Sequence, residues 1–350
     1  MNKITRHSLP GGMEAVHLHI PGAPVSHFGI AVRAGSSDEQ DDLQPGLAHF
    51  VEHTLFKGTH KRSSWHIINR MESIGGELNA FTTKEDTVVY TSFPRGALSR
   101  AVDLVVDLVL NSIFPTKEIE REREVICEEI NSYRDSPSEA VYDDFEDILY
   151  SGTPLGHNIL GTLQSVRSIT SEMCKDWLKT HYIASKMVVF YAGATSFDNF
   201  IKKSTPFLSQ IPLGEPARTT FGTFSAKTPH FTVCSSVDTH QAHTVMGLSL
   251  SALNKKEKVT MALLTNILGG PGMNSLLNMS LREKRGLVYN VESVLTNWQN
   301  SQAMFTTYFG TDAHDTEKCV DLVEGEIKKS PTAFLTTGAL KRLRNNIAAN

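Results

Sequence analysis

The 350-residue sequence has few features of a secreted, membrane-bound or nucleic-acid-binding protein. Its four cysteines stand far apart with no CxxC pair, which argues against a disulfide framework and indicates a reducing compartment. No apolar run approaches the roughly 18 residues of a membrane span, and the N-terminus lacks the apolar core of a signal peptide. A net charge of −4 argues against nucleic-acid binding, which needs a basic surface. We therefore expect a soluble cytoplasmic protein with neither membrane nor nucleic acid as a partner.

The chain does contain an internal repeat. The segment that begins at His27 resembles the segment that begins at His243, 216 residues later. The run Val102-Asp-Leu-Val recurs as Val320-Asp-Leu-Val, at nearly the same spacing. A third match, of a Pro-Thr pair, follows in the same order. Three matches at nearly one spacing predict a duplicated domain.

Each half shows the same order of predicted elements: an alternating strand, a helix, a Gly-Gly break, a β-rich run and an amphipathic helix. In the first half these are residues 28–34, 46–57, 75–76, 87–93 and 98–110; in the second half they are residues 244–250, 256–268, 269–270, 303–309 and 316–328. Strands in adjacent runs, mixed with helices, favour an α+β fold over a parallel βαβ sheet.

The repeat also predicts the domain boundaries. We expect a first domain over residues 1–205, a linker over residues 206–218 and a second domain over residues 219–350. The first half continues past its Pro-Thr pair with a helix and on to about residue 200, whereas little follows the second pair. On the repeat spacing, on the order of 65 residues are missing, so the second domain is expected to be incomplete at its C-terminus.

The pattern that carries chemistry is HxxEH, formed by His49, Glu52 and His53. On a helix the two histidines lie one turn apart on one face, so both imidazoles can bind one metal ion. Glu52 lies beside that face, where it reaches a water on the metal and not the metal itself. Imidazoles and a carboxylate with an open fourth position are typical of a catalytic zinc site. Without a ligand, these polar side chains would be costly to bury in an otherwise apolar helix.

A third protein ligand is expected from the predicted helix at residues 117–134, which carries six glutamates. At 100° per residue, Glu122 and Glu129 fall within the apolar arc of this helix, two turns apart on one face. A carboxylate on a core face needs a metal ion or a hydrogen-bond partner. One of the two can therefore bind zinc while the other steadies a ligand histidine. Helix geometry alone does not rank Glu122 against Glu129.

These motifs together resemble the pitrilysin, insulin-degrading enzyme and mitochondrial processing peptidase family of inverted-motif zinc peptidases, in its two-domain bacterial type. The resemblance rests on GLAHFVEHTLFKGT (46–59), GGELNAFTTKEDTVVY (75–90), EREREVICEEI (120–130) and LREKRGLVYNV (281–291). It implies two homologous α/β-roll domains, each a mainly antiparallel sheet with helices packed on it. It also implies Glu129 as the third zinc ligand and Glu122 as the partner of a ligand histidine.

The resemblance further implies substrate contacts. Asn79 and Ala80 match a strand edge that holds the substrate main chain; the plainer alternative is an ordinary turn into a strand. Arg282 and Tyr289 match a pair that binds and polarises the substrate carbonyl; the plainer alternative is a surface arginine and a core tyrosine. The second repeat has no HxxEH, so one zinc ion (Zn2+) per chain is expected. Arg282 and Tyr289 are then expected to act in trans, in a homodimer or in a heterodimer with a homologous subunit.

We therefore expect a zinc metalloendopeptidase that hydrolyses unfolded peptides or small proteins in an enclosed chamber, with Glu52 as the general base. One alternative is a catalytically silent binding or assembly subunit of the same fold, against which the intact HxxEH motif and Glu129 argue. Another is a presequence-processing peptidase subunit. The histidines outside the motif are expected to be structural, among them His17, His157 and His240.

Overall fold

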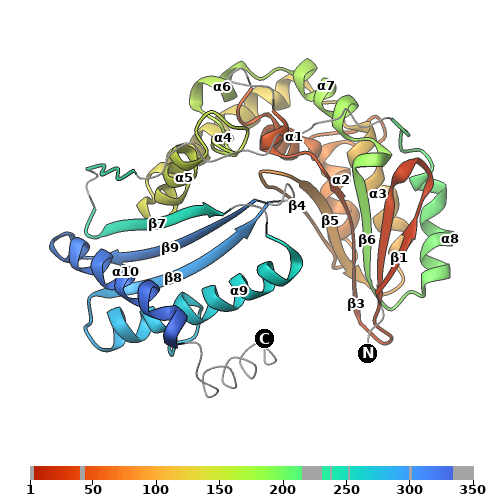
Figure 1. Ribbon diagram of the computed structural model, residues 1–350. Coiled ribbons are helices and arrows are strands. Elements are labelled where there is room, and N and C mark those ends of the chain that lie inside the picture. The colour runs from red at the N-terminus through yellow and green to blue at the C-terminus, as the bar shows by residue number, and fades with distance from the viewer. Residues whose placement is uncertain are drawn as a thin grey trace. The chain divides into compact units, whose positions relative to one another are not determined.

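The computed structural model describes residues 4–39, 44–214, 231–236, 239–250, 253–298 and 302–333. The chain forms two compact units, and Figure 1 labels their elements. The first unit comprises Met1–Ser132 and His157–Thr220, and the second comprises Tyr133–Gly156 and Phe221–Asn350. A segment from the first half of the sequence is therefore part of the second unit.

The first unit is built on a six-stranded sheet in the order β1-β2-β6-β3-β5-β4. The strands are β1 (Ile4–Ser8), β2 (Glu14–His19), β3 (Val25–Val32), β4 (Glu77–Thr82), β5 (Thr87–Pro94) and β6 (Met187–Gly193). All pairs are antiparallel except β2 with β6. β6, which comes roughly a hundred residues after β5, lies between β2 and β3. β4 is an outer strand of this sheet, and its Ala80 pairs with Val89 of β5.

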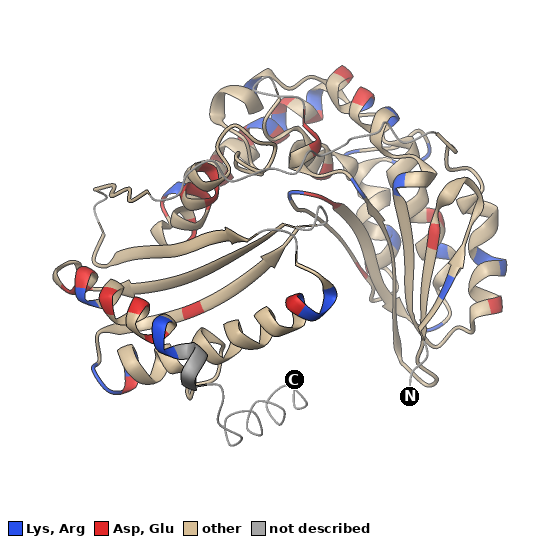
Figure 2. Ribbon diagram, viewed as in Figure 1, with Lys and Arg blue, Asp and Glu red and all other residues tan. Residues whose placement is uncertain are grey.

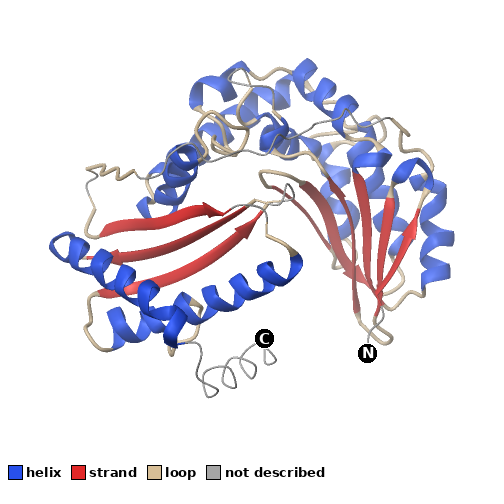
Figure 3. Ribbon diagram, viewed as in Figure 1, coloured by secondary structure: helices blue, strands red, loops and turns tan. Residues whose placement is uncertain are grey.

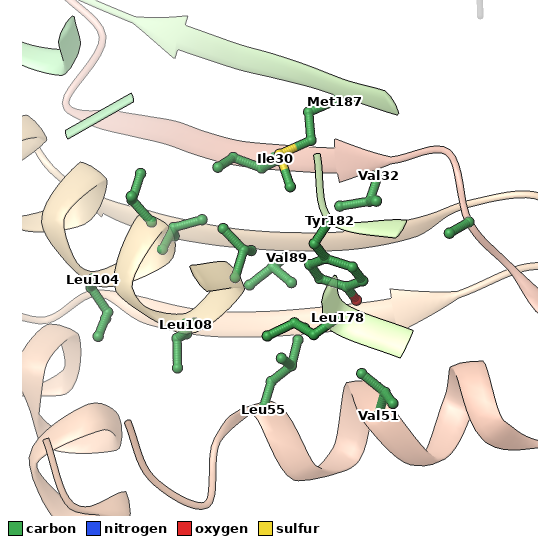
Figure 4. Packing of buried hydrophobic residues seen from close by; sticks show 14 of the residues in the cluster. Ile30, Val32, Val51, Leu55, Val89, Leu104, Leu108, Leu178, Tyr182 and Met187 are labelled. Atoms are coloured by element: carbon green, nitrogen blue, oxygen red, sulfur yellow. The ribbon is translucent and has the colours of Figure 1, made fainter. Parts of the chain in front are cut away.

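Helices cover one face of this sheet (Figure 3). They are α1 (Leu47–Leu55), α2 (Ser64–Glu72), α3 (Leu98–Asn111), α7 (Ser171–His181) and α8 (Phe197–Leu208). Two further helices, α4 (Thr116–Arg134) and α6 (Leu163–Ser168), lie beyond this face. Val51 and Leu55 of α1 point into the buried cluster beside Val89 and Leu178 (Figure 4). Each such side chain, when fully buried, contributes about 1.5–3 kcal/mol to folding. The apolar side of α1 is thus fixed in the core.

The second unit contains a three-stranded antiparallel sheet in the order β7-β9-β8. Its elements are α5 (Pro137–Leu149), β7 (Ala242–Leu250), α9 (Lys255–Gly269), a π-helix (Asn278–Glu283), β8 (Val288–Asn297), β9 (Ala303–Thr311) and α10 (Thr316–Ala333). Tyr142 of α5 stacks on Tyr308 of β9 and donates a hydrogen bond of 2.8 Å to Glu292 of β8. Figure 2 shows that acidic residues are frequent along α5, and the contacts of Tyr142 join this charged helix to the sheet.

The two units repeat one arrangement. In the first, strand β3 is followed by two helices, strands β4 and β5 and helix α3. In the second, β7 is followed by α9 and the π-helix, by β8 and β9, and by α10. In both, the first of these strands pairs with the third, and the third pairs with the second. The predicted α+β fold of two homologous domains is confirmed.

The domain boundaries expected from the repeat stay a prediction. Residues 206–208, the start of the expected linker, form the end of α8. Residues 215–218 of the expected linker and residues 334–350 at the C-terminus lie outside the described residues. Within the described residues, no helix is long and apolar enough to cross a membrane.

Candidate active site

The site is built on α1, whose first turn is held by the carboxylate of Glu39 in the segment before the helix. Glu39 accepts the backbone N–H of Gly46 at 3.0 Å and that of Ala48 at 2.8 Å. His157 contacts the same carboxylate, with Nε2 at 3.0 Å from Oε2. Gly46 itself has φ 92°, and a Cβ there would lie 2.5 Å from the carbonyl oxygen of Leu160. Glycine is required at this position, and Glu39 supplies the cap that glycine lacks.

His49, His53 and Glu129 come together as the sequence predicts for ligands of one metal ion. One donor atom from each lies within 4.8 Å of the other two. Nε2 of His49 is 3.9 Å from Oε1 of Glu129, and Nε2 of His53 is 3.5 Å from Oε2. Among the described residues this is the one group of three or more His, Cys, Asp or Glu side chains that could hold an ion.

The donor set fits zinc. Tetrahedral zinc with bonds of about 2.0–2.2 Å places its donors roughly 3.4 Å apart, close to the two measured separations. A zinc ligand must be a neutral imidazole. Burial, with a smaller contribution from His53, lowers the pKa of His49 to about 3, so this ring is neutral at physiological pH. Two imidazole nitrogens and one carboxylate leave a coordination position for a substrate or water.

Glu122 lies behind His53. Its Oε1 is 3.1 Å from Nδ1 of His53, and its Oε2 is 2.6 Å from Nζ of Lys57. Burial raises the pKa of Glu122, but the hydrogen bonds from His53 and Lys57 outweigh it and hold this pKa below its ordinary value. An ionised Glu122 accepts a hydrogen bond from Nδ1–H of His53 and so directs the Nε2 lone pair of His53 toward the side where Glu129 lies.

Glu52 lies one residue before His53, with a side chain that is largely buried. The hydroxyl of Thr82, the last residue of β4, donates a hydrogen bond of 3.3 Å to Oε2 of Glu52. Burial raises the pKa of Glu52, while His53 and Thr82 partly offset the rise. A carboxylate with a raised pKa is better matched to proton transfer near neutral pH.

Asn79 and Ala80 lie on β4, the same outer strand that ends at Thr82. The Asn79 side chain is exposed, and its Oδ1 accepts the backbone N–H of Ala80 at 2.8 Å. These two residues are therefore on the strand that contacts Glu52. Their contact with a substrate remains a prediction.

Arg282 and Tyr289 lie in the second unit. Arg282 is in the π-helix, with Nε at 3.9 Å from Oε1 of Glu283. Tyr289 lies on β8 beside an irregularity in the pairing with β9, and 77% of its surface is exposed. It is therefore not a core residue of this chain. The catalytic role of both residues remains a prediction.

Three residues of this site escaped the sequence analysis: Lys57, Thr82 and Glu39. Lys57 follows His53 by four residues, a helical spacing that could have identified it. For Thr82 the sequence offered only a weaker indication, namely its position two residues after Ala80 in the predicted substrate-binding strand. Glu39 precedes α1 in an irregular segment, so no periodicity marks it. The contact of His157 with Glu39 is consistent with the structural role expected for this histidine.

An imidazole–imidazole–carboxylate cluster beside a buried glutamate is the arrangement typical of catalytic zinc sites in hydrolases. Residues 15–163 match the family model described as insulinase (peptidase family M16), and residues 168–347 match the model described as peptidase M16 inactive domain. The chain belongs to peptidase family M16. It is thus a member of a zinc metallopeptidase family, as the motifs predict.

Several bacterial relatives are named uncharacterized zinc proteases. That of Streptomyces coelicolor is 32% identical over 323 residues, which cover 90% of this chain and 70% of the relative. That of Bacillus subtilis is 29% identical over 331 residues, covering 92% of this chain and 77% of the relative. A crystal structure of a peptidase M16 inactive domain from Pseudomonas fluorescens has a TM-score of 0.89 at 21% identity, over 99% of this chain and 83% of that one. This structural match supports the fold.

Proposed function

We propose that the protein is a zinc-dependent endopeptidase in which Glu52 is the general base. The observation that carries the proposal is the cluster of His49, His53 and Glu129 with Glu52 next to it. Membership of a peptidase family and relatives named zinc proteases support a metallopeptidase.

In this reaction the bound zinc ion, Glu52 and Thr82 have separate roles. Zinc, when bound, supplies Lewis-acid chemistry that acidifies water and polarises a peptide carbonyl. Glu52 takes the proton of the attacking water and later delivers it to the leaving amine. The Thr82 hydroxyl fixes Oε2 of Glu52, so that Oε1 is available for the proton. The raised pKa of Glu52 makes it a stronger base for the proton of the attacking water.

The substrate is an unfolded peptide or small protein. An extended peptide adds to the outer edge of β4 near Asn79 and Ala80, where main-chain hydrogen bonds provide affinity that tolerates many sequences. Arg282 and Tyr289 donate hydrogen bonds to the substrate carbonyl. They do so in trans, from the partner subunit of a homodimer or from a homologous subunit, and the two subunits enclose a chamber.

Each chain binds one zinc ion, because the helix that corresponds to α1 in the second unit, α9, has no histidine. The protein works in the cytoplasm of a bacterium. Its four cysteines are free thiols, three of them buried, which fits a reducing compartment.

Two substitutions test the assignment of base and ligand. Glu52→Gln should retain about one zinc per chain and lose about 100-fold or more of peptide cleavage, since a general base contributes on that order. Glu129→Gln should lose zinc, and Glu128→Gln, an exposed neighbour on α4, should change neither property. Zinc content by metal analysis and cleavage of quenched fluorescent peptides provide the readouts. Cleavage by Glu52→Gln at the parent rate would show that Glu52 is not the base.

The same assays test the other expected functions. A wild-type chain that binds zinc and cleaves no peptide from an unstructured library would support a silent binding or assembly subunit. Cleavage restricted to presequence-like peptides would instead support a processing subunit.

A further inference from the structure

The Glu122 carboxylate is held at both oxygens by groups of one short segment. His53 contacts Oε1 at 3.1 Å, and Lys57 contacts Oε2 at 2.6 Å. Glu122 is 7% exposed, so its charge is shielded from water and depends on these two partners. A carboxylate with one held oxygen can still rotate about its last bond, whereas one with both held cannot.

The two ligand histidines differ in how their rings are held. The His49 side chain is 9% exposed, and its Nδ1 has no hydrogen-bond partner in the described part of the chain. Packing holds this ring. The His53 side chain is 23% exposed, and the partner of its Nδ1 is Glu122. The orientation of His53 therefore depends more on hydrogen bonding than that of His49.

Lys57 is placed to maintain that orientation. It lies two residues past the end of α1, and its backbone N–H donates to the carbonyl of Thr54 at 3.1 Å. The backbone at Lys57 is thereby fixed relative to His53, four residues earlier, and the ammonium group contacts Glu122. We propose that Lys57 is a positioning residue of the metal site: it holds Glu122 in the orientation that aims His53 at the metal. The proposal rests on the proposed zinc site.

Whether zinc binding weakens or tightens when Lys57 is removed distinguishes a positioning role from a purely electrostatic one. Lys57 is a cation near a site for a dication, so removing its charge alone would tighten zinc binding. If Lys57 acts by orienting Glu122, removing it weakens zinc binding instead. Loss of groups that orient metal ligands typically costs about 10-fold to 100-fold in metal affinity.

The test measures the zinc dissociation constant by competition with a chromogenic chelator. Lys57→Met should raise this constant about 10-fold. Lys57→Arg, which keeps the charge and a donor, should stay near the wild type. Lys61→Met is the matched control, since Lys61 is more exposed and lies 4.0 Å from Asp107, away from Glu122. A single cooperative thermal transition of the metal-free protein in every variant shows that the fold is intact. The absorption spectrum of the cobalt-substituted protein should change only for Lys57→Met.

A double-mutant cycle with Glu122→Gln decides whether Lys57 acts through Glu122. In the Glu122→Gln background, Lys57→Met should change the zinc dissociation constant less than about 2-fold. An equal loss in both backgrounds, or unchanged or tighter binding by Lys57→Met, would overturn the role of Lys57. A wild-type chain that takes up no zinc would instead overturn the proposed function.

Discussion

Acid should destabilise the first unit through His181, the last residue of α7. Its ring is 9% exposed and lies against Trp177, with ring centroids 4.1 Å apart. Nδ1 is 2.8 Å from Nζ of Lys186, which in turn lies 3.3 Å from Oδ1 of Asp38. The ammonium group donates to Nδ1, so protonation of the ring would bring two cations into contact. Burial and the charge of Lys186 lower the pKa of His181 to about 3.

The sign of the pH dependence follows from this shift. Above pH 6.5 the ring is neutral in both the folded and the unfolded chain, and the group has no effect on stability. Below pH 6.5 the unfolded chain binds a proton that the folded chain does not, until about pH 3. The free energy of unfolding should therefore fall by about 1.4 kcal/mol per pH unit in this window. At pH 5.0 the loss from His181 amounts to about 2 kcal/mol.

Urea unfolding of the metal-free protein at pH 7.5 and pH 5.0 measures this loss. In His181→Asn, the amide oxygen can take the place of Nδ1 as acceptor for Lys186, and the titrating ring is gone. The stability difference between wild type and variant should shift by about 2 kcal/mol in favour of the variant at the lower pH. Other groups, including His49, cancel in that difference. His66→Asn, at an exposed position of α2, should keep the wild-type pH dependence. An identical pH dependence in wild type and His181→Asn would refute the argument.

Three further outcomes are expected. Thr82→Val should lower kcat by about 10-fold or more, the value of one hydrogen bond to a carboxylate, with KM and zinc content unchanged; Thr82→Ser should restore the rate, and a normal kcat for Thr82→Val would contradict the contact with Glu52. Glu39→Gln should lower the free energy of unfolding by about 1–3 kcal/mol, because the amide replaces an acceptor of three hydrogen bonds; the exposed Glu72→Gln serves as control. If the second subunit acts in trans, mixing inactive Glu52→Gln and Arg282→Ala proteins should regain cleavage by forming mixed dimers. A fully active monomer in analytical ultracentrifugation would rule this out.

Local spacing made the helix of the HxxEH motif predictable, because 3.6 residues per turn place His49 and His53 on one face. The same reasoning left Glu122 and Glu129 unranked, since both lie on one face of α4. In the structure they differ through the placement of α4 beside α1: Glu129 faces the Nε2 atoms of both histidines, and Glu122 faces Nδ1 of His53. The placement of two helices relative to each other is a tertiary property that neither helix encodes in its own periodicity.

The parts of the fold that the sequence did not predict depend on contacts with other segments of the chain. β6 lies between β2 and β3 although more than a hundred residues separate it from either, and alternation within a strand says nothing about its neighbours. Residues 133–156 begin with the last two residues of α4 but belong to the second unit, where Tyr142 contacts Tyr308 and Glu292. In both cases a partner far away in sequence decides the outcome. Glu39 caps α1 from an irregular segment just before the helix, where no periodicity marks it.

The reacting groups need positions fixed to about 0.5 Å, and loops rarely provide this. α1 meets the requirement because it is held along its whole length: at its start by Glu39, along its apolar side by Val51 and Leu55, and near its end by the contact between Lys57 and Glu122. Glu52 is held in addition by the hydrogen bond from Thr82 at the end of β4. A peptide bound along β4 would rest on the same strand that positions the proposed base. Substitutions at Asn79 and Ala80 should therefore affect substrate affinity first, those at Thr82 should affect proton transfer first, and those around Glu122 should affect zinc affinity first.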